Sequence, residues 1–234
     1  MIPISDDPGP RRLTPIVTFM LLAINIAVFV YQLTLGRGVE TLWRSAGVVP
    51  LEYARGIDIP PAAPLDVYYT TLLTSMFLHG GFLHIASNML FLWIYGDNVE
   101  DRLGHLRFLL FYLLCGFGAT GFHLFFNWGS PIPSIGASGA IAGVLAGYLV
   151  LFPSASIRTL LFIGPFITVT RVPAIILIGF WFVTQLFSGV ASIAEVAEQT
   201  SGIAFWAHVG GFVVGLPLVL LFRRPAHTQR YALR

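Results

Sequence analysis

Long apolar runs constrain this chain more than any other feature of its sequence. The six runs lie at about 15–35, 82–97, 106–126, 137–152, 172–190 and 203–222. A helix needs about 20 apolar residues to cross a bilayer, and most of these runs come near that length. Only 10% of the 234 residues are charged, against about 25% in a typical soluble domain. The chain is therefore predicted to be an all-α membrane protein that forms one compact helical bundle.

The first run raises one alternative, because Arg11 and Arg12 precede it as basic residues precede a secretory signal. Its apolar core is longer than the roughly 7–15 residues of a signal, and no small-x-small cleavage site follows in residues 31–40. We interpret it as a retained first span.

The 13 basic residues, all arginine, predict the orientation of the bundle. If both termini are cytoplasmic, ten arginines fall on the cytoplasmic side and only Arg37, Arg44 and Arg55 fall in outer loops. Cytoplasmic loops of membrane proteins carry such an excess of arginine. The predicted organisation is a cytoplasmic tail (1–14), a six-helix bundle (15–222) with a long outer loop (36–81), and a second cytoplasmic tail (223–234).

A few polar side chains interrupt the apolar runs, and each is costly inside a bilayer, so each is a functional candidate. The predicted topology brings four of them to a similar depth on the outer side. They are His84 and Asn88 in the second span, Ser138 in the fourth and His208 in the sixth. The orientation rests on arginines alone, so this convergence is an independent observation.

Glycines recur every fourth residue after the serine of the fourth span and after the histidine of the sixth. They include Gly139, Gly143, Gly211 and Gly215. Such smooth faces let two helices pack closely, which would bring Ser138 and His208 within hydrogen-bonding reach. A serine hydroxyl becomes a nucleophile when a neighbouring base takes its proton, and histidine is suited to that role.

His84 and Asn88 are four residues apart and share one helical face. Together with the backbone N–H of Ser138, they could donate hydrogen bonds to an oxyanion. Plainer interpretations exist for each feature: a serine at a helix start is often a cap, and glycine repeats simply pack helices. Gln185 and His123 are expected to make structural hydrogen bonds. Spacing alone leaves both interpretations open.

Other intramembrane chemistries fit the sequence less well. No His-Glu-x-x-His zinc motif is present, and the 11 acidic residues fall outside the predicted spans or at their edges. An aspartyl enzyme would need paired carboxylates inside the membrane, and a catalytic triad would need one. A serine–histidine dyad without metal or cofactor is therefore expected. The arginines are scattered, so no nucleic-acid partner is expected either.

Three sequence blocks resemble the rhomboid family of intramembrane serine proteases. They are FLHGGFLHIASNMLFLWIYGDNVEDRLG (77–104), GASGAIAG (136–143) and AHVGGFVVG (207–215), and the whole resemblance covers about residues 70–222. It implies a six-helix fold in which Ser138 is the nucleophile and His208 the general base and acid. It also implies that His84, Asn88 and Gly136 form the oxyanion site, that Gly211 and Gly215 pack helices, and that Glu100 and Gly104 form a structural element.

Two positions depart from the family pattern. Some members carry an aromatic residue four positions after the serine, stacked on the catalytic histidine, whereas this chain has Ala142. Many members also have Trp-Arg where this chain has Thr70 and Thr71. Neither departure touches the expected dyad, but the first leaves the orientation of His208 to other contacts.

The predicted function is hydrolysis of peptide bonds in or near transmembrane segments of membrane proteins. The predicted location is the cell membrane, with the active site facing the extracytoplasmic side, and the partners are the bilayer and transmembrane substrates. One alternative is a non-catalytic rhomboid-like protein that binds membrane clients, which the retained Ser138 and His208 disfavour. Another is a small transporter or channel, which the lack of inverted repeats and of intramembrane carboxylates disfavours.

Overall fold

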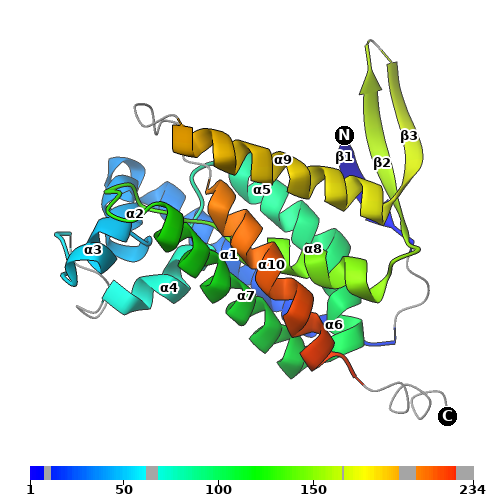
Figure 1. Cartoon of the computed structure of the whole chain (residues 1–234), viewed down its shortest axis with the longest axis horizontal. Helices are drawn as coiled ribbons and strands as arrows, with labels where there is room; N and C mark the ends of the chain where they lie inside the picture. Colours follow the sequence, from blue (N-terminus) through cyan, green and yellow to red (C-terminus); the bar gives the residue numbers. More distant parts are fainter. Residues whose placement is uncertain (8–11, 62–67, 165, 195–203, 225–234) are drawn as a thin grey trace.

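The computed structural model describes residues 1–7, 12–61, 68–164, 166–194 and 204–224; the tail predicted at 223–234 lies outside them from residue 225 on. Most of the described chain is helical (Figure 1). In chain order the elements are β1 (Ile2–Asp6), α1 (Ile16–Thr34), η1 (Gly36–Gly38), α2 (Val39–Ala46), α3 (Pro50–Arg55), η3 (Tyr68–Thr70), α4 (Thr71–Thr74), η4 (Ser75–Phe77), α5 (Phe82–Phe91), η5 (Leu92–Gly96), α6 (Asp97–Leu103), α7 (His105–Phe126), α8 (Ser138–Leu151), β2 (Ser156–Ile163), β3 (Phe166–Pro173), α9 (Ala174–Ala194) and α10 (Phe205–Phe222).

Four described helices, α1, α7, α9 and α10, are long and apolar enough to cross a membrane. A bent pair, Thr71–Phe77 with Phe82–Leu103, makes a fifth candidate, and its two parts meet at 94°. The remaining apolar helix, α8, has only 14 residues. These lengths agree with an all-α membrane protein, whereas the sixth span and the cytoplasmic position of both termini stay predictions.

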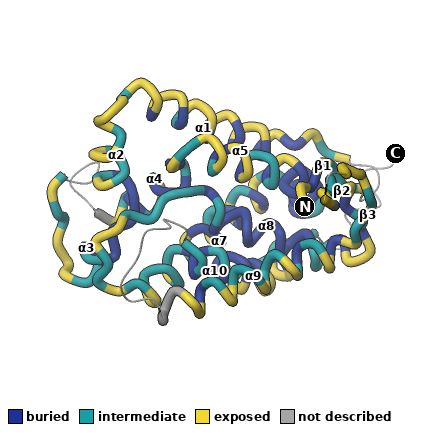
Figure 2. Tube along the Cα trace, turned by 90° about the horizontal axis from the view of Figure 1, so that it is seen from above, coloured by how far each residue is buried: buried dark blue, intermediate teal, exposed yellow. Residues whose placement is uncertain are grey.

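Helix α8 lies in the interior of the bundle. Every residue from Gly139 to Tyr148 is buried, and α7 and α10 pack against this helix. Figure 2 shows the buried segments gathered around α7 and α8, whereas the outer sides of α1 and α9 are exposed. The sequence of α8 is apolar on all sides, as is typical of a helix that is surrounded by other helices. At 1.5 Å per residue it is about 21 Å long, shorter than the hydrocarbon core of about 30 Å.

Small residues let α8 and α10 touch through their backbones. A Cβ atom added to Gly211 would lie 1.9 Å from the carbonyl oxygen of Gly139, and one added to Gly215 would lie 2.7 Å from the Cα of Gly143. On its other side, Gly143 packs against Cys115 of α7. This close approach sets the distance between the first residues of α8 and the first turns of α10.

Gly211→Ala is expected to lower the free energy of unfolding by about 1–3 kcal/mol, because the new methyl group forces the two helices apart. The midpoint of thermal unfolding in detergent measures the effect. Gly121→Ala on α7 is the matched control, since a Cβ there meets nothing within 4 Å. Equal midpoints for the two variants would contradict the close contact.

The buried carboxylate of Glu100 joins α6 to the start of α1. Its oxygens accept hydrogen bonds from the backbone N–H groups of Val17 (2.9 Å) and Thr18 (2.7 Å) and from the Thr18 hydroxyl (2.7 Å). The first N–H groups of a helix have no partner within the helix, so Glu100 supplies one. Gly104 ends α6 with a positive φ of 84°. The helical segment that begins with α5 thus ends at Leu103, six residues beyond the apolar run predicted to end at 97.

A three-stranded antiparallel sheet was not predicted. Strands β2 and β3 form a hairpin that stands across the direction of the helices in Figure 1, and β1 pairs with β2. Strand β1 lies within residues 1–14, which were expected to form only a polar tail. Its Asp6 carboxylate accepts hydrogen bonds from Asn98 Nδ2 (2.7 Å) and the Tyr148 hydroxyl (2.8 Å). The sheet is thereby attached to the helical bundle.

Candidate active site

Ser138 is the first residue of α8, directly after a turn that is held by backbone hydrogen bonds. In that turn Gly136 has a φ of +129°, a conformation that residues with a side chain rarely adopt, and its N–H donates to the carbonyl of Ser75 (2.8 Å). Just upstream, the backbone of Ser134 exchanges two hydrogen bonds with Val48 of the loop between α2 and α3 (3.0 and 2.8 Å). These contacts hold the serine at the N-terminus of a buried helix, where unpaired N–H groups favour negative charge.

His208 lies in the first turns of α10 and meets Ser138 directly. The distance between His208 Nε2 and Ser138 Oγ is 2.7 Å. Both residues are half-buried. A serine hydroxyl that donates to an imidazole nitrogen at this distance is set to transfer its proton.

The second ring nitrogen of His208 also has a partner. Nδ1 lies 2.6 Å from Oε1 of Gln185 on α9, and the Trp181 ring lies 5.7 Å from the His208 ring, centroid to centroid. An amide oxygen only accepts, so Nδ1 carries the hydrogen and Nε2 is free to accept the serine proton. The interhelical hydrogen bond expected of Gln185 is present, and its partner is the histidine of the pair.

His84 approaches the turn before Ser138. Its Nε2 would lie 2.8 Å from a Cβ added to Gly136, so only glycine leaves room for the ring at this point. The N–H of Gly80 donates to His84 Nδ1 (3.3 Å). Because a neutral imidazole carries one N–H, the hydrogen is then on Nε2, which faces the turn. His84 can therefore donate a hydrogen bond beside the serine.

Asn88 contacts a buried histidine. Its Nδ2 lies 3.0 Å from Nε2 of His79, a fully buried residue of the loop before α5. The backbone N–H and C=O of His79 bond in turn to the side-chain amide of Gln32 on α1 (3.0 and 2.7 Å). The His79 ring packs edge-on against His84, with centroids 5.0 Å apart. His79 thus supports both residues predicted to bind the oxyanion, a role that its loop position in the sequence did not indicate.

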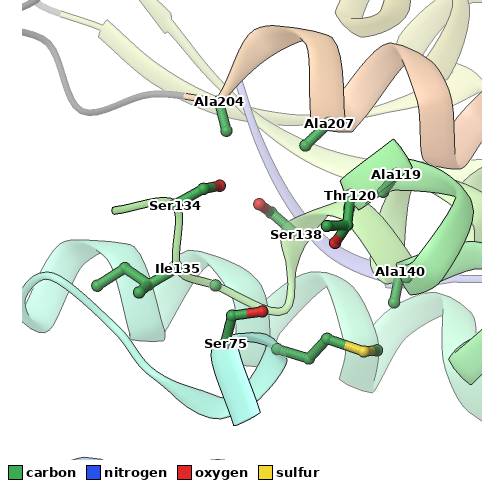
Figure 3. Close-up of a pocket in the computed structure, with 13 residues that line it drawn as sticks. Ser75, Ala119, Thr120, Ser134, Ile135, Ser138, Ala140, Ala204 and Ala207 are labelled. Carbon is green, nitrogen blue, oxygen red and sulfur yellow. The ribbon is translucent and has the colours of Figure 1, made fainter. Parts of the chain in front are cut away.

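A small cavity of about 20 Å³ opens beside Ser138 (Figure 3). Its lining is formed mostly by small side chains from α7, α8, α10 and the turns around them. They include Gly116, Ala119, Thr120, Ser134, Gly136, Gly139, Ala140, Ala204 and Ala207. Such a volume holds about one water molecule, and Ser75, Thr120 and Ser134 offer hydroxyl groups to it.

The structure therefore brings together Ser138, His208, His84 and Gly136, and Asn88 contacts His79. His123 lies near the end of α7, where its Nδ1 is 3.3 Å from Nδ2 of Asn127, the residue after the helix. The arrangement pairs a nucleophile with a base and an N–H donor next to both. This combination is suited to acyl transfer.

The chain is similar to a known family and to several known proteins. The family described as Rhomboid domain matches residues 67–225. Rhomboid protein 1, mitochondrial, of Saccharomyces cerevisiae is 34% identical over 214 residues, which are 85% of this chain and 51% of the yeast protein. RHOMBOID-like protein 4 of Arabidopsis thaliana is 32% identical over 175 residues, 74% of this chain and 39% of that protein.

A bacterial relative is also similar. Rhomboid protease GluP of Bacillus subtilis is 38% identical over 145 residues, 62% of this chain and 24% of that protein. The chain thus spans about half the length, or less, of the curated relatives it matches.

Proposed function

This chain belongs to the rhomboid family, and we propose that it is an intramembrane serine endopeptidase that cleaves peptide bonds in or near transmembrane segments. The observation that carries this proposal is the 2.7 Å contact between His208 Nε2 and Ser138 Oγ. A relative named as a protease, GluP, supports the same reaction class.

The proposed reaction proceeds through an acyl-enzyme. His208 takes the hydroxyl proton as Ser138 Oγ attacks the scissile carbonyl, and the tetrahedral oxyanion accepts hydrogen bonds from the Ser138 N–H and from His84 Nε2–H. His208 then gives the proton to the leaving amine, and the peptide bond breaks. A water molecule, deprotonated by His208, attacks the acyl carbon, and its proton returns to Ser138. Asn88, held by His79, is proposed as a further donor to the oxyanion.

The arginine distribution and the helix lengths support a proposed position of Ser138 in the membrane. We place the six spans with both termini in the cytoplasm, as the arginine distribution predicts. Because α8 is about 9 Å shorter than the hydrocarbon core, a serine at its outer end would lie below the outer surface. The polar groups around it then form a recess that water can reach from the extracytoplasmic side of the cell membrane.

The small cavity beside Ser138 supports a proposal for the substrate class. Helical carbonyls are hydrogen-bonded and shielded, so a scissile bond must leave its helix before a serine can attack it. The cavity beside Ser138 is lined largely by glycine and alanine and has room for little more than a water-sized group. We therefore expect cleavage next to small residues, in transmembrane segments with helix-destabilising residues near the outer boundary.

His84→Ala is expected to lower kcat by about 10²–10³-fold and to leave KM nearly unchanged, because the lost donor acts on the oxyanion that forms only in the transition state. Leu83→Ala is the matched control, since Leu83 precedes His84 on α5 and its side chain is 83% exposed. Initial rates over a range of substrate concentrations in detergent micelles give both constants. An equal loss in kcat for the two variants would argue against a role for His84 at the oxyanion.

Reconstitution tests the proposed function. The purified chain is placed in lipid vesicles with single-span substrates, and the fragments are weighed by mass spectrometry. We expect two fragments whose masses add up to the substrate plus one water, with the cut near the outer end of the span. Intact substrates together with ion or solute flux through the vesicles would instead favour a channel or transporter.

A further inference from the structure

The contacts that orient His208 come from one helix, α9. Gln185 Oε1 lies 2.6 Å from His208 Nδ1, and the Trp181 ring lies 5.7 Å from the imidazole. Trp181 and Gln185 are four residues apart, so they share the face of α9 that meets α10. On α8, the residue one turn after Ser138 is the fully buried Ala142, which offers no ring and no polar group.

A glutamine in this position needs an explanation. Three of its neighbours on α9 are apolar side chains exposed to the surroundings of the bundle: Val183 (45%), Leu186 (39%) and Phe187 (72%). An amide in such a membrane-spanning helix is costly unless a hydrogen bond offsets the loss of water. His208 Nδ1 supplies that bond, so the amide and the imidazole are matched to each other.

The bond selects one form of the histidine. A neutral imidazole carries its hydrogen on either Nδ1 or Nε2, and only the Nδ1–H form leaves Nε2 free to accept the Ser138 proton. Because Gln185 Oε1 accepts only, it stabilises the Nδ1–H form and also fixes the rotation of the ring. Without this acceptor the Nε2–H form becomes available, and that form presents a hydrogen to the serine hydroxyl instead of a lone pair.

We propose that Gln185 is a positioning residue that completes a Ser138–His208–Gln185 relay, in which a neutral amide from α9 holds the tautomer and the orientation of the general base. This proposal rests on the proposed protease function. It adds a third member to the pair, uncharged and located on a different helix from either catalytic residue. The amide stays an acceptor at every pH, unlike a carboxylate in the same place.

Three variants test the role of Gln185 in activity. Gln185→Leu removes the acceptor and should lower kcat by about 10- to 100-fold with little change in KM, a part of the roughly 10²–10⁴-fold that a positioned base contributes. Gln185→Glu keeps an acceptor oxygen and should restore most of that loss. Thr184→Val is the matched control, because the Thr184 hydroxyl bonds only to the Trp181 carbonyl of its own helix (2.6 Å) among the contacts described here, and it should keep the wild-type kcat.

The pH profile separates positioning from a general packing effect. A carboxylate next to His208 favours the protonated imidazole, which is no longer a base. The acid limb of the kcat profile of Gln185→Glu should therefore move to higher pH than that of the wild type. This comparison still decides the question if Gln185→Leu fails to fold. A wild-type kcat in Gln185→Leu, or a Gln185→Glu variant with an unmoved acid limb, would overturn the proposal.

A second measurement does not depend on protease activity. Nitrogen-15 NMR of the histidine-labelled protein reports which ring nitrogen carries the hydrogen, and the His208 signals are identified by their loss in His208→Ala. The wild type should show the Nδ1–H form, and Gln185→Leu a mixture of both forms. The same tautomer mixture in both proteins would overturn the role of Gln185 even if the wild type cleaves substrate. A wild type that holds the Nδ1–H form but cleaves nothing would instead refute the protease function.

Discussion

Ser138→Ala is expected to slow the cleavage of a transmembrane substrate by at least about 10⁴-fold, because without Oγ the acyl-enzyme cannot form. The variant loses one hydrogen bond, to His208 Nε2, and a small half-buried atom, so its fold should be unchanged. Single-turnover rates, with enzyme in excess over substrate in lipid vesicles, measure a loss of this size.

Ser87→Ala is the control for this result. Ser87 is an exposed serine on α5 whose hydroxyl bonds to the His84 carbonyl of its own helix (3.0 Å), and its loss should leave the rate near the wild-type value. Cleavage by Ser138→Ala at a rate similar to that of Ser87→Ala would show that another group attacks the substrate.

His208→Ala is expected to cost about as much as the loss of Ser138, because the hydroxyl is a poor nucleophile without a base 2.7 Å away. The double variant Ser138→Ala, His208→Ala should then be no slower than either single variant. Residues that act as one catalytic unit show such non-additivity. The measurement is the single-turnover rate of all four proteins in the same vesicles.

Independent contributions would give a different result. If His208 served only to pack α10 against its neighbours, the two losses would add in free energy and the double variant would be much slower than each single variant. The midpoints of thermal unfolding, compared between His208→Ala and the wild type, separate a loss of stability from a loss of the base.

The helices of the bundle could be predicted because a helix that crosses the hydrocarbon core needs about 20 mostly apolar residues in a row. Five of the six predicted runs end within a few residues of α1, α7, α8, α9 and α10. The second run differs, because the helix continues from the predicted end at 97 to Leu103. Its charged residues end the apolar pattern, but the buried Glu100 accepts hydrogen bonds from the N–H groups of Val17 and Thr18 in α1, which are 83 and 82 residues away in the chain.

The three-stranded sheet was not predicted from the sequence. The runs SIRTLLFI and FITVTRVP are rich in β-branched residues and flank Gly164. This pattern is typical of a β-hairpin, but a search for long apolar runs does not detect it. The pairing of β1 with β2 has no such local signal. It joins segments far apart in the chain, such as Ile2 with Leu160 and Asp6 with Ile157.

The contact between Ser138 and His208 could be predicted, but the further partners of the site residues could not. Polar residues in apolar runs identified Ser138, His208, His84 and Asn88, because the cost of burial in lipid makes each of them conspicuous. Their partners depend on helix rotation, which periodicity does not specify. The contact of Asn88 with His79 and that of His208 with Gln185 therefore became visible only in the structure.

Covalent labelling tests the proposed Ser138–His208 mechanism most directly. The purified protein in detergent is treated with a fluorophosphonate, which forms a covalent bond only with an activated serine, and the modified peptide is identified by mass spectrometry. The proposed mechanism predicts one adduct, on Ser138, that forms in the wild type and is lost in His208→Ala. A folded wild type that forms no adduct, or an adduct on Ser138 that forms equally fast without His208, would contradict it.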